Sequence, residues 1–347
     1  MARLVGSPSA VNPAVRLAVT YGKLLLTDWG VKAAEDRIIS ICCGSLTFQA
    51  AHRGRGVTAV LERSEYPPGV PCWIDTAQPD PEAATRFYGG LFGWEFEDQM
   101  PSDAPGNYFI ARLHGLDVAA IGSQPDGAPP TPVWNTYVAV DSADDAATKI
   151  TNAGGSTLAE PFDILDAGRM GIFSDPSGAV FSVWQAKQHI GAQLVNDAGT
   201  WNFSDLNTLD VDGAEAFYGA VFGWVAKSFG AGGMEFPMFC LPGYGDFLEK
   251  SDPDLRARLA EMNGPTGFED VGAGLVAMTS DQFPDDVPPH WSVTFAVDDT
   301  DAIAARAGEL GGTVMVPPFD AGPTRVAILS DPQGAVFTAS RFDPEAL

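Results

Sequence analysis

The sequence predicts an α+β protein of two tandem domains that repeat one order of strands and helices. Two similar stretches open the repeats: PCWIDTAQPDPEAATRFYGGLFGW begins at Pro71, and TWNFSDLNTLDVDGAEAFYGAVFGW begins at Thr200. They align without a gap when Phe87 is placed on Phe217. The chain has 347 residues, of which 45% are hydrophobic, so it is long and apolar enough for two cores.

The repeat continues to the end of each domain. VWNTYVAVDSADDAATKITNAGG from Val133 matches HWSVTFAVDDTDAIAARAGELGG from His290, and SDPSGAVF from Ser174 matches SDPQGAVF from Ser330. Internal repeats of this length mark structural units. We therefore expect a first domain at residues 66–187, a linker at 188–195 and a second domain at 196–343.

Each domain is predicted to contain two smaller strand-helix-strand units. In the first unit, Asp80 caps a helix with Pro81 in its first turn, and an apolar stripe at helical spacing ends at Gly93. In the second unit, the alternating strand WNTYVAV leads into an alanine-rich helix that ends at Gly154 and Gly155. The FYG and FGW motifs are interpreted as core packing, since aromatic residues at helical spacing usually fill an interior.

Two segments fall outside the repeat. Residues 244–288 form an insertion in the second domain with its own helix in SDPDLRARLAEMNGP, which is either a lid over a pocket or a surface elaboration. Residues 1–63 match neither repeat. They could be a disordered arm, a small added element or translated sequence that is not native, and the last interpretation is favoured because VTAVLERSEYPPGV from Val57 resembles a natural lead-in.

The charge and cysteine content exclude several classes of partner. The formal charge is −25, and residues 1–63 hold eight basic against four acidic side chains, so the rest is strongly acidic. Such a body repels phosphate backbones and anionic lipid, which argues against nucleic acid and membrane partners. Four cysteines without a CxxC spacing favour reduced thiols, and the absence of a signal or membrane segment in the sequence predicts a cytoplasmic protein.

These motifs resemble the vicinal oxygen chelate (VOC) superfamily, the glyoxalase, bleomycin-resistance and extradiol-dioxygenase proteins, in a tandem form. The resemblance rests on DPEAA, FYG and FGW at the start and SDPxGAVF at the end of each repeat, and it covers residues 66–343. It implies two paired βαβββ modules per domain, with curved mixed sheets around a cleft. It also implies that the two domains bury against each other, and a homodimer of the whole chain remains an option.

The resemblance also implies where a metal would be held, because metal-dependent members project His and Glu from the first and last strands of each module. Here those positions fall on other side chains, namely Trp73, Asn135 and Ser182 in the first domain and Phe203, Ser292 and Thr338 in the second. None of these is a usual ligand of a divalent metal. The sequence therefore predicts no cofactor and no metal site, with an unusual half-site of His290 and Asp205 as the alternative.

Strand alternation places further side chains on the same face as these positions. In the first domain the cleft set is Trp73, Asp75, Asn135, Tyr137, Ser182 and Trp184. In the second domain the corresponding set, which includes Phe203, Asp205, Ser292 and Thr338, is smaller and more polar. Three aromatic rings beside a carboxylate suit a flat, partly apolar molecule, so the first cleft is the expected binding site.

Asp75 and Asp205 occupy the same place in the two repeats and are the candidate catalytic residues. A carboxylate in an aromatic cleft has a raised pKa and can serve as a general base or a hydrogen-bond acceptor. Alternatively, each Asp supports the scaffold by fixing the backbone or by pairing with Arg169 or Arg325.

Three functions remain. The favoured hypothesis is a metal-free protein of the glyoxalase/bleomycin-resistance type that binds a small apolar or aromatic molecule in the first cleft. The alternatives are a VOC-type enzyme, acting as a glyoxalase, dioxygenase or isomerase through an atypical metal site or through Asp75, and an interaction scaffold with closed clefts.

Overall fold

The computed structural model describes residues 62–125, 131–231, 234–261, 264–280, 283–284 and 286–343. The expectations for the leader at 1–63 therefore lie almost entirely outside the described residues. Among the described residues, no helix has both the length and the apolar character needed to cross a membrane.

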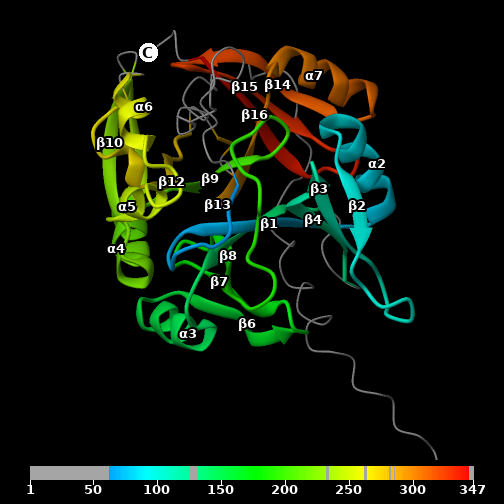
Figure 1. Ribbon diagram of the computed structural model, residues 1–347, viewed down its shortest axis with the longest axis horizontal. Helices are drawn as coiled ribbons and strands as arrows, with labels where there is room; N and C mark the ends of the chain where they lie inside the picture. Colours follow the sequence, from blue (N-terminus) through cyan, green and yellow to red (C-terminus); the bar gives the residue numbers. More distant parts are fainter. Residues whose placement is uncertain are drawn as a thin grey trace, which may run out of the picture.

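Two mixed sheets of eight strands form the body of the molecule, which confirms the α+β class and the tandem arrangement (Figure 1). The first sheet has the order β2-β3-β4-β1-β5-β8-β7-β6. Its strands are β1 (Pro71–Gln78), β2 (Glu95–Asp98), β3 (Tyr108–Leu113), β4 (Leu116–Ser123), β5 (Trp134–Ala139), β6 (Ser156–Ile164), β7 (Gly168–Ser174) and β8 (Val180–Ala186). The two modules of a domain thus join through the central pair β1 and β5, which is antiparallel.

The second sheet repeats this order as β10-β11-β12-β9-β13-β16-β15-β14. Its strands are β9 (Trp201–Thr208), β10 (Val225–Ala231), β11 (Met234–Cys240), β12 (Val271–Ala277), β13 (His290–Ala296), β14 (Thr313–Ala321), β15 (Thr324–Ser330) and β16 (Val336–Phe342). Strands β9 and β13 form the matching central pair.

One helix follows the first strand of each module, and its limits follow from local sequence. Helix α2 (Pro81–Phe92) begins where the Asp80 carboxylate accepts a hydrogen bond from the backbone N–H of Ala83 at 2.9 Å, and it ends at Gly93, which has a φ of 76°. The other three are α3 (Ala143–Asn152), α4 (Val211–Phe222) and α7 (Thr300–Glu309). The predicted cap, first-turn proline and glycine stop of α2 are confirmed.

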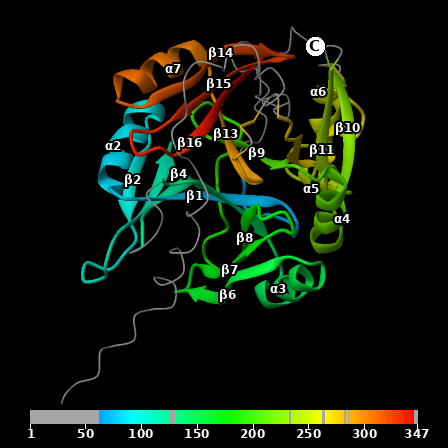
Figure 2. The same ribbon diagram turned by 180° about the vertical axis from the view of Figure 1, so that it is seen from behind.

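The domains pack crosswise, so that each helix of a first module contacts the second module of the other domain. Helix α2 lies beside α7, and α4 lies beside α3 on the opposite side of the molecule, as both views show (Figures 1 and 2). The indole of Trp94 donates to the carbonyl of Gly199, and that of Trp224 donates to Gly69, each at 2.7 Å. These paired contacts give the chain the symmetry of a dimer within one polypeptide.

Tyr88 shows that the FYG motif is core, as expected, and that this core is shared. Its side chain is fully buried and stacks on Trp94 with ring centroids 5.7 Å apart. It also contacts Phe337 of the second domain at 5.9 Å. In the other half, Tyr218 packs against Phe181 of the first domain at 5.7 Å. Burial of these aromatic rings therefore holds the domains together as well as each sheet to its helix.

The stretch expected as one insertion, 244–288, is divided by a strand of the sheet. Residues 241–270 separate β11 from β12 and carry α5 (Tyr244–Leu248), α6 (Leu255–Glu261) and the short 3-10 helix η2 (Phe268–Asp270). Leu259 and Phe268 from this segment join a buried cluster with Met238, and Phe203 packs against it. Since Met238 neighbours Gly274, which neighbours Asp205, the segment covers the face of the second sheet on which Asp205 lies.

Candidate functional site

The strand register fixes which side chains meet at the centre of the first sheet. Asp75 lies opposite Asn135 on β5 and beside Ala120 on β4, while Tyr137 lies opposite Trp73 and beside Ser182. All five predicted residues of this central group therefore share one face, which we call the inner face of domain one. The position in β4 that corresponds to Ser182 in β8 is Ala120, a residue that the sequence alone did not place.

Asp75 is the polar centre of this face. Its Oδ1 accepts a hydrogen bond from the amide of Asn135 at 2.9 Å, and its Oδ2 accepts from the hydroxyls of Tyr137 at 2.8 Å and Tyr108 at 3.0 Å. Burial raises the pKa of the Asp75 carboxyl, and the three hydrogen bonds oppose this rise by stabilising the carboxylate. Desolvation is the larger of these opposing effects, so the pKa of Asp75 stays above its usual value.

Three aromatic side chains surround this carboxylate. Trp73 donates its indole N–H to Tyr108 at 3.2 Å, and Tyr137 meets Trp184 edge to face at 6.5 Å. Trp73, Tyr137 and Trp184 are exposed by 3%, 7% and 6%. All three aromatic side chains are therefore almost inaccessible to solvent.

Tyr108 and His189 contact this group, and neither was among the predicted site residues. Tyr108 lies on β3, whose pairing with β4 contains a register shift between Ala111 and Arg112. Counting alternate residues from the hairpin turn would therefore assign Tyr108 to the wrong face of the sheet. The ring of His189, in the predicted linker, lies 4.5 Å from Trp73 and 5.9 Å from Trp184. The position of a His directly after a strand that carries Trp184 was the available signal.

The inner face of domain two is built differently around Asp205. Only Thr294 donates to its Oδ2, at 3.4 Å, and its Oδ1 is buried without a hydrogen-bond partner in the described part of the chain. A Cβ at Gly274 would lie 1.9 Å from this Oδ1, so the carboxyl occupies the space that glycine leaves. Burial raises the pKa of Asp205 to about 7, because little opposes the desolvation of the charged form.

The remaining predicted residues of domain two lie around Asp205. Ser292 is opposite Asp205, and its hydroxyl accepts a hydrogen bond from Asn207 at 3.0 Å. Phe203, Ser292 and Thr338 are partly exposed, whereas Ser182 in the first domain is buried. The two inner faces thus carry different side chains, and Thr338 is more exposed than Ser182.

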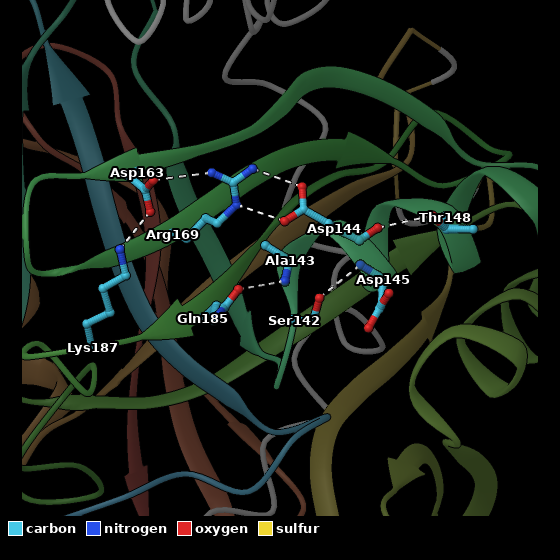
Figure 3. A network of polar contacts seen from close by, with 9 residues as sticks. All are labelled: Ser142, Ala143, Asp144, Asp145, Thr148, Asp163, Arg169, Gln185 and Lys187. Atoms are coloured by element: carbon cyan, nitrogen blue, oxygen red, sulfur yellow. Dashed lines mark hydrogen bonds and ion pairs between the residues drawn. The ribbon is translucent and has the colours of Figure 1, made fainter.

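The alternative in which Asp75 or Asp205 pairs with an arginine is wrong. Arg169 donates to Asp144 at 2.9 Å and contacts Asp163 at 3.5 Å, where Lys187 also binds (Figure 3). Arg325 makes the equivalent contacts in domain two, with Asp301 and Asp320. These exposed ion pairs link a helix to its sheet and leave the buried aspartates to neutral partners.

The residues at the central positions do not fit a metal ion. The four positions are Trp73, Ala120, Asn135 and Ser182 in one domain and Phe203, Gly274, Ser292 and Thr338 in the other, and none has the imidazole or carboxylate that divalent metals prefer. Across the described ranges, no three His, Cys, Asp or Glu side chains are grouped closely enough to bind a metal. His290 bonds through Nδ1 to the carbonyl of Pro288 at 2.9 Å and joins no such group.

Comparison with known proteins agrees with this architecture. A model described as the glyoxalase/bleomycin resistance protein/dioxygenase superfamily matches residues 73–183, and one described as a glyoxalase-like domain matches residues 203–340. The chain belongs to this superfamily, with two domains in tandem.

Two relatives align along most of their length. A Mycobacterium tuberculosis protein named "Putative glyoxylase CFP32" is 41% identical over 288 residues, which cover 82% of this chain and 99% of that protein. The anthracycline biosynthesis protein DnrV of Streptomyces peucetius is 32% identical over 290 residues, covering 79% and 94%. A variant of homoprotocatechuate 2,3-dioxygenase from B. fuscum has the same fold, with a TM-score of 0.50 and 11% identity over 82% of this chain and 75% of that one.

Proposed function

We propose that the chain is a metal-independent small-molecule-binding protein whose first domain holds a flat, partly apolar ligand on its inner face. The observation that carries this proposal is the Asp75 group: one buried carboxylate with three fixed donors, set among Trp73, Tyr137 and Trp184. Aromatic walls with a few convergent polar groups are typical of small-molecule sites. The side chains at the central positions support a mode of binding that needs no metal.

The chemistry of the face favours an aromatic ligand with hydroxyl or carbonyl substituents. Indole and phenol rings bind flat apolar surfaces, and the Tyr hydroxyls around Asp75 can exchange one hydrogen bond for a ligand substituent. The name of the Streptomyces relative, an anthracycline biosynthesis protein, supports planar fused-ring compounds as the first class to test.

Entry of the ligand requires a ring to move, and we assign this movement to Trp184. Its strand β8 lies further from the sheet centre than β1 and β5, and its indole is fixed by a single hydrogen bond to the carbonyl of His189, at 2.8 Å. Trp73, in contrast, is held in the central strand by Tyr108 and the Asp75 group.

A calorimetric titration with a hydroxylated anthraquinone tests this function. The Asp75→Asn variant should bind at least about tenfold more weakly, equivalent to about 1.4 kcal/mol, because the amide disrupts the tyrosine hydrogen bonds. The matched Asp205→Asn variant should bind as the unchanged chain does. Equal losses in both variants, or no binding by the unchanged chain to this probe and to a two-ring naphthoquinone, would contradict the proposal.

Acid–base catalysis is the second candidate, and it is favoured by the buried Oδ1 of Asp205, which has no hydrogen-bond partner in the described part of the chain, with burial raising the pKa of this carboxyl to about 7. A carboxyl that titrates near neutral pH can take a proton from a substrate carbon and return it, as an isomerase requires. A carbon acid that binds to the protein should then exchange hydrogen for deuterium in heavy water, and Asp205→Asn should abolish the exchange. Exchange that persists in both the Asp75→Asn and the Asp205→Asn variants would exclude this role.

A further inference from the structure

Residues 188–194, which fall within the stretch 188–195 expected as a linker, are hydrogen-bonded across one end of the first sheet. The backbone N–H of His189 donates to Ala167 at 3.0 Å, that of Ala192 donates to Cys72 at 2.8 Å, and that of Gln193 donates to Asp117 at 2.6 Å. These acceptors lie in the turn before β7, on β1 and on β4. The segment therefore crosses from the second module to the first, and we call it the strap.

The strap meets the aromatic walls through His189. Its ring lies edge to face with Trp73 at 81° and with Trp184 at 83°, and its carbonyl accepts the indole N–H of Trp184. The side chain of His189 is 19% exposed. One residue thus holds Trp184, the ring to which we assign ligand entry, and fills the space between the two indoles.

One ring nitrogen of His189 lies near a carboxylate without forming a hydrogen bond to it. Its Nε2 is buried without a hydrogen-bond partner in the described part of the chain, and Oδ2 of Asp117 lies 3.6 Å away. Asp117 on β4 already accepts from Arg112 on β3 at 2.7 Å, and Arg112 also binds Glu97 on β2. Among the described residues, the His189 ring also contacts the uncharged indoles on β1 and β8, and the turn before β7 carries the exposed Asp166 next to Ala167.

We propose that the strap is a proton-sensitive closure of the domain one cleft, in which His189 is the positioning residue and its neutral imidazole holds Trp184 shut. The closure itself rests on the hydrogen bonds and ring contacts of the strap. Admission of a ligand by the open strap rests on the proposed function.

The direction of the response follows from the two states of His189. In the closed strap, burial lowers the pKa of His189 below its usual value, and Asp117 only partly opposes this. In the open strap, the ring is solvated and its pKa returns to about 6.5. The closed state is therefore favoured above that pH and becomes less stable relative to the open state as the pH falls, so acid opens the strap.

Hydrogen exchange on the intact chain measures the opening without a ligand. After correction for intrinsic rates, protection of the strap amides should fall by up to about tenfold between about pH 7.5 and about pH 5.5. The His189→Gln variant cannot be protonated and should show no such change. The matched control is His290→Gln, since burial also lowers the pKa of His290, in domain two, and this variant should keep the response.

Two further variants keep the test decisive if His189→Gln folds poorly. A Cβ at Gly191, which has a φ of 111°, would lie 2.2 Å from the carbonyl of Cys72, so Gly191→Ala should expose the strap at every pH. In Asp117→Asn, the imidazole titration of His189, followed by NMR, should move to lower pH because a stabilising charge is lost. Unchanged strap protection between the two pH values, or a response that survives in His189→Gln, overturns the closure. If strap protection falls with pH as expected but the chain does not bind the anthraquinone, only the proposed function is overturned.

Discussion

The phenol of Tyr88 donates a hydrogen bond to the carboxylate of Asp331, 3.1 Å away and 243 residues further along the chain. Tyr218 repeats the contact in the other direction, with Asp175 at 3.1 Å. In both cases the tyrosine comes from an FYG motif and the aspartate from the SDPxG turn of the other domain. The duplicated motifs thus recognise each other, and this reciprocity explains how two similar domains find one relative orientation.

Removing one of these hydroxyls should destabilise the whole chain. Tyr88→Phe takes a donor from buried Asp331 and an acceptor from the indole of Trp134, so we expect a loss of about 1–3 kcal/mol in the free energy of unfolding. Urea denaturation measures it, and Tyr218→Phe should show a similar loss. The control is Tyr244→Phe in the insertion, expected to cost less than about 0.5 kcal/mol. An equal effect at the control position would contradict the interdomain role.

The raised pKa of Asp205 predicts a pH-dependent effect of its removal. Between the unfolded value near 4 and the folded value of about 7, the folded state binds one more proton than the unfolded state, so rising pH removes stability at about 1.4 kcal/mol per unit. The Asp205→Asn variant escapes this loss. Its stability relative to the unchanged chain should rise by about 2–3 kcal/mol from pH 5 to pH 7.5 in parallel denaturation curves. A difference that stays constant over this range would show that Asp205 is not desolvated.

Gly274 should tolerate a methyl group only when Asp205 is shortened. In Gly274→Ala the new Cβ meets Oδ1 of Asp205 at 1.9 Å, and the rearrangement should cost about 1–3 kcal/mol by thermal or urea unfolding. In an Asp205→Ala background the same substitution should cost less than about 1 kcal/mol. Additive costs would place the strain in the backbone instead.

The side chains at the central positions predict that added metal leaves stability unchanged. If an ion bound to the folded state with a dissociation constant one thousandth of its concentration, it would add about 4 kcal/mol. Millimolar Mn²⁺, Ni²⁺ or Zn²⁺ should instead shift the unfolding midpoint by no more than matched Mg²⁺ does. Native mass spectrometry of protein purified without chelator is the companion measurement, and a stoichiometric metal adduct would refute this expectation.

Helix ends and strand faces could be predicted from the sequence because they depend on residues that are close together along the chain. Asp80 and Gly93 delimit a helix through bonds within four residues of themselves, and alternation along β1 and β5 placed Trp73, Asp75 and Tyr137 on one face. The partners across the molecule were not predictable in this way. A buried face shows that something covers it, but it does not say which segment, so the crosswise packing of α2 on the second domain needed the structure.

The site shows the same division. The sequence located Asp75 but, for a structural role, offered only backbone contacts or an arginine as its partner, because matching positions in a repeat do not reveal side-chain reach. Tyr108 was hidden by the register shift in β3, and His189 by the assumption that residues between domains only connect them. The helix predicted in SDPDLRARLAEMNGP begins only at Leu255, within that stretch.

The internal symmetry of the chain has an evolutionary consequence. In an assembly of two identical subunits, any substitution appears in both clefts, so neither can change alone. A chain that carries both halves is free of this constraint: Asp75 accepts from Tyr108, Asn135 and Tyr137, whereas Asp205 lies against Gly274 and accepts from Thr294 at 3.4 Å. A gene that encodes both halves can keep the shared core under selection while one cleft specialises and the other is released to acquire a different task.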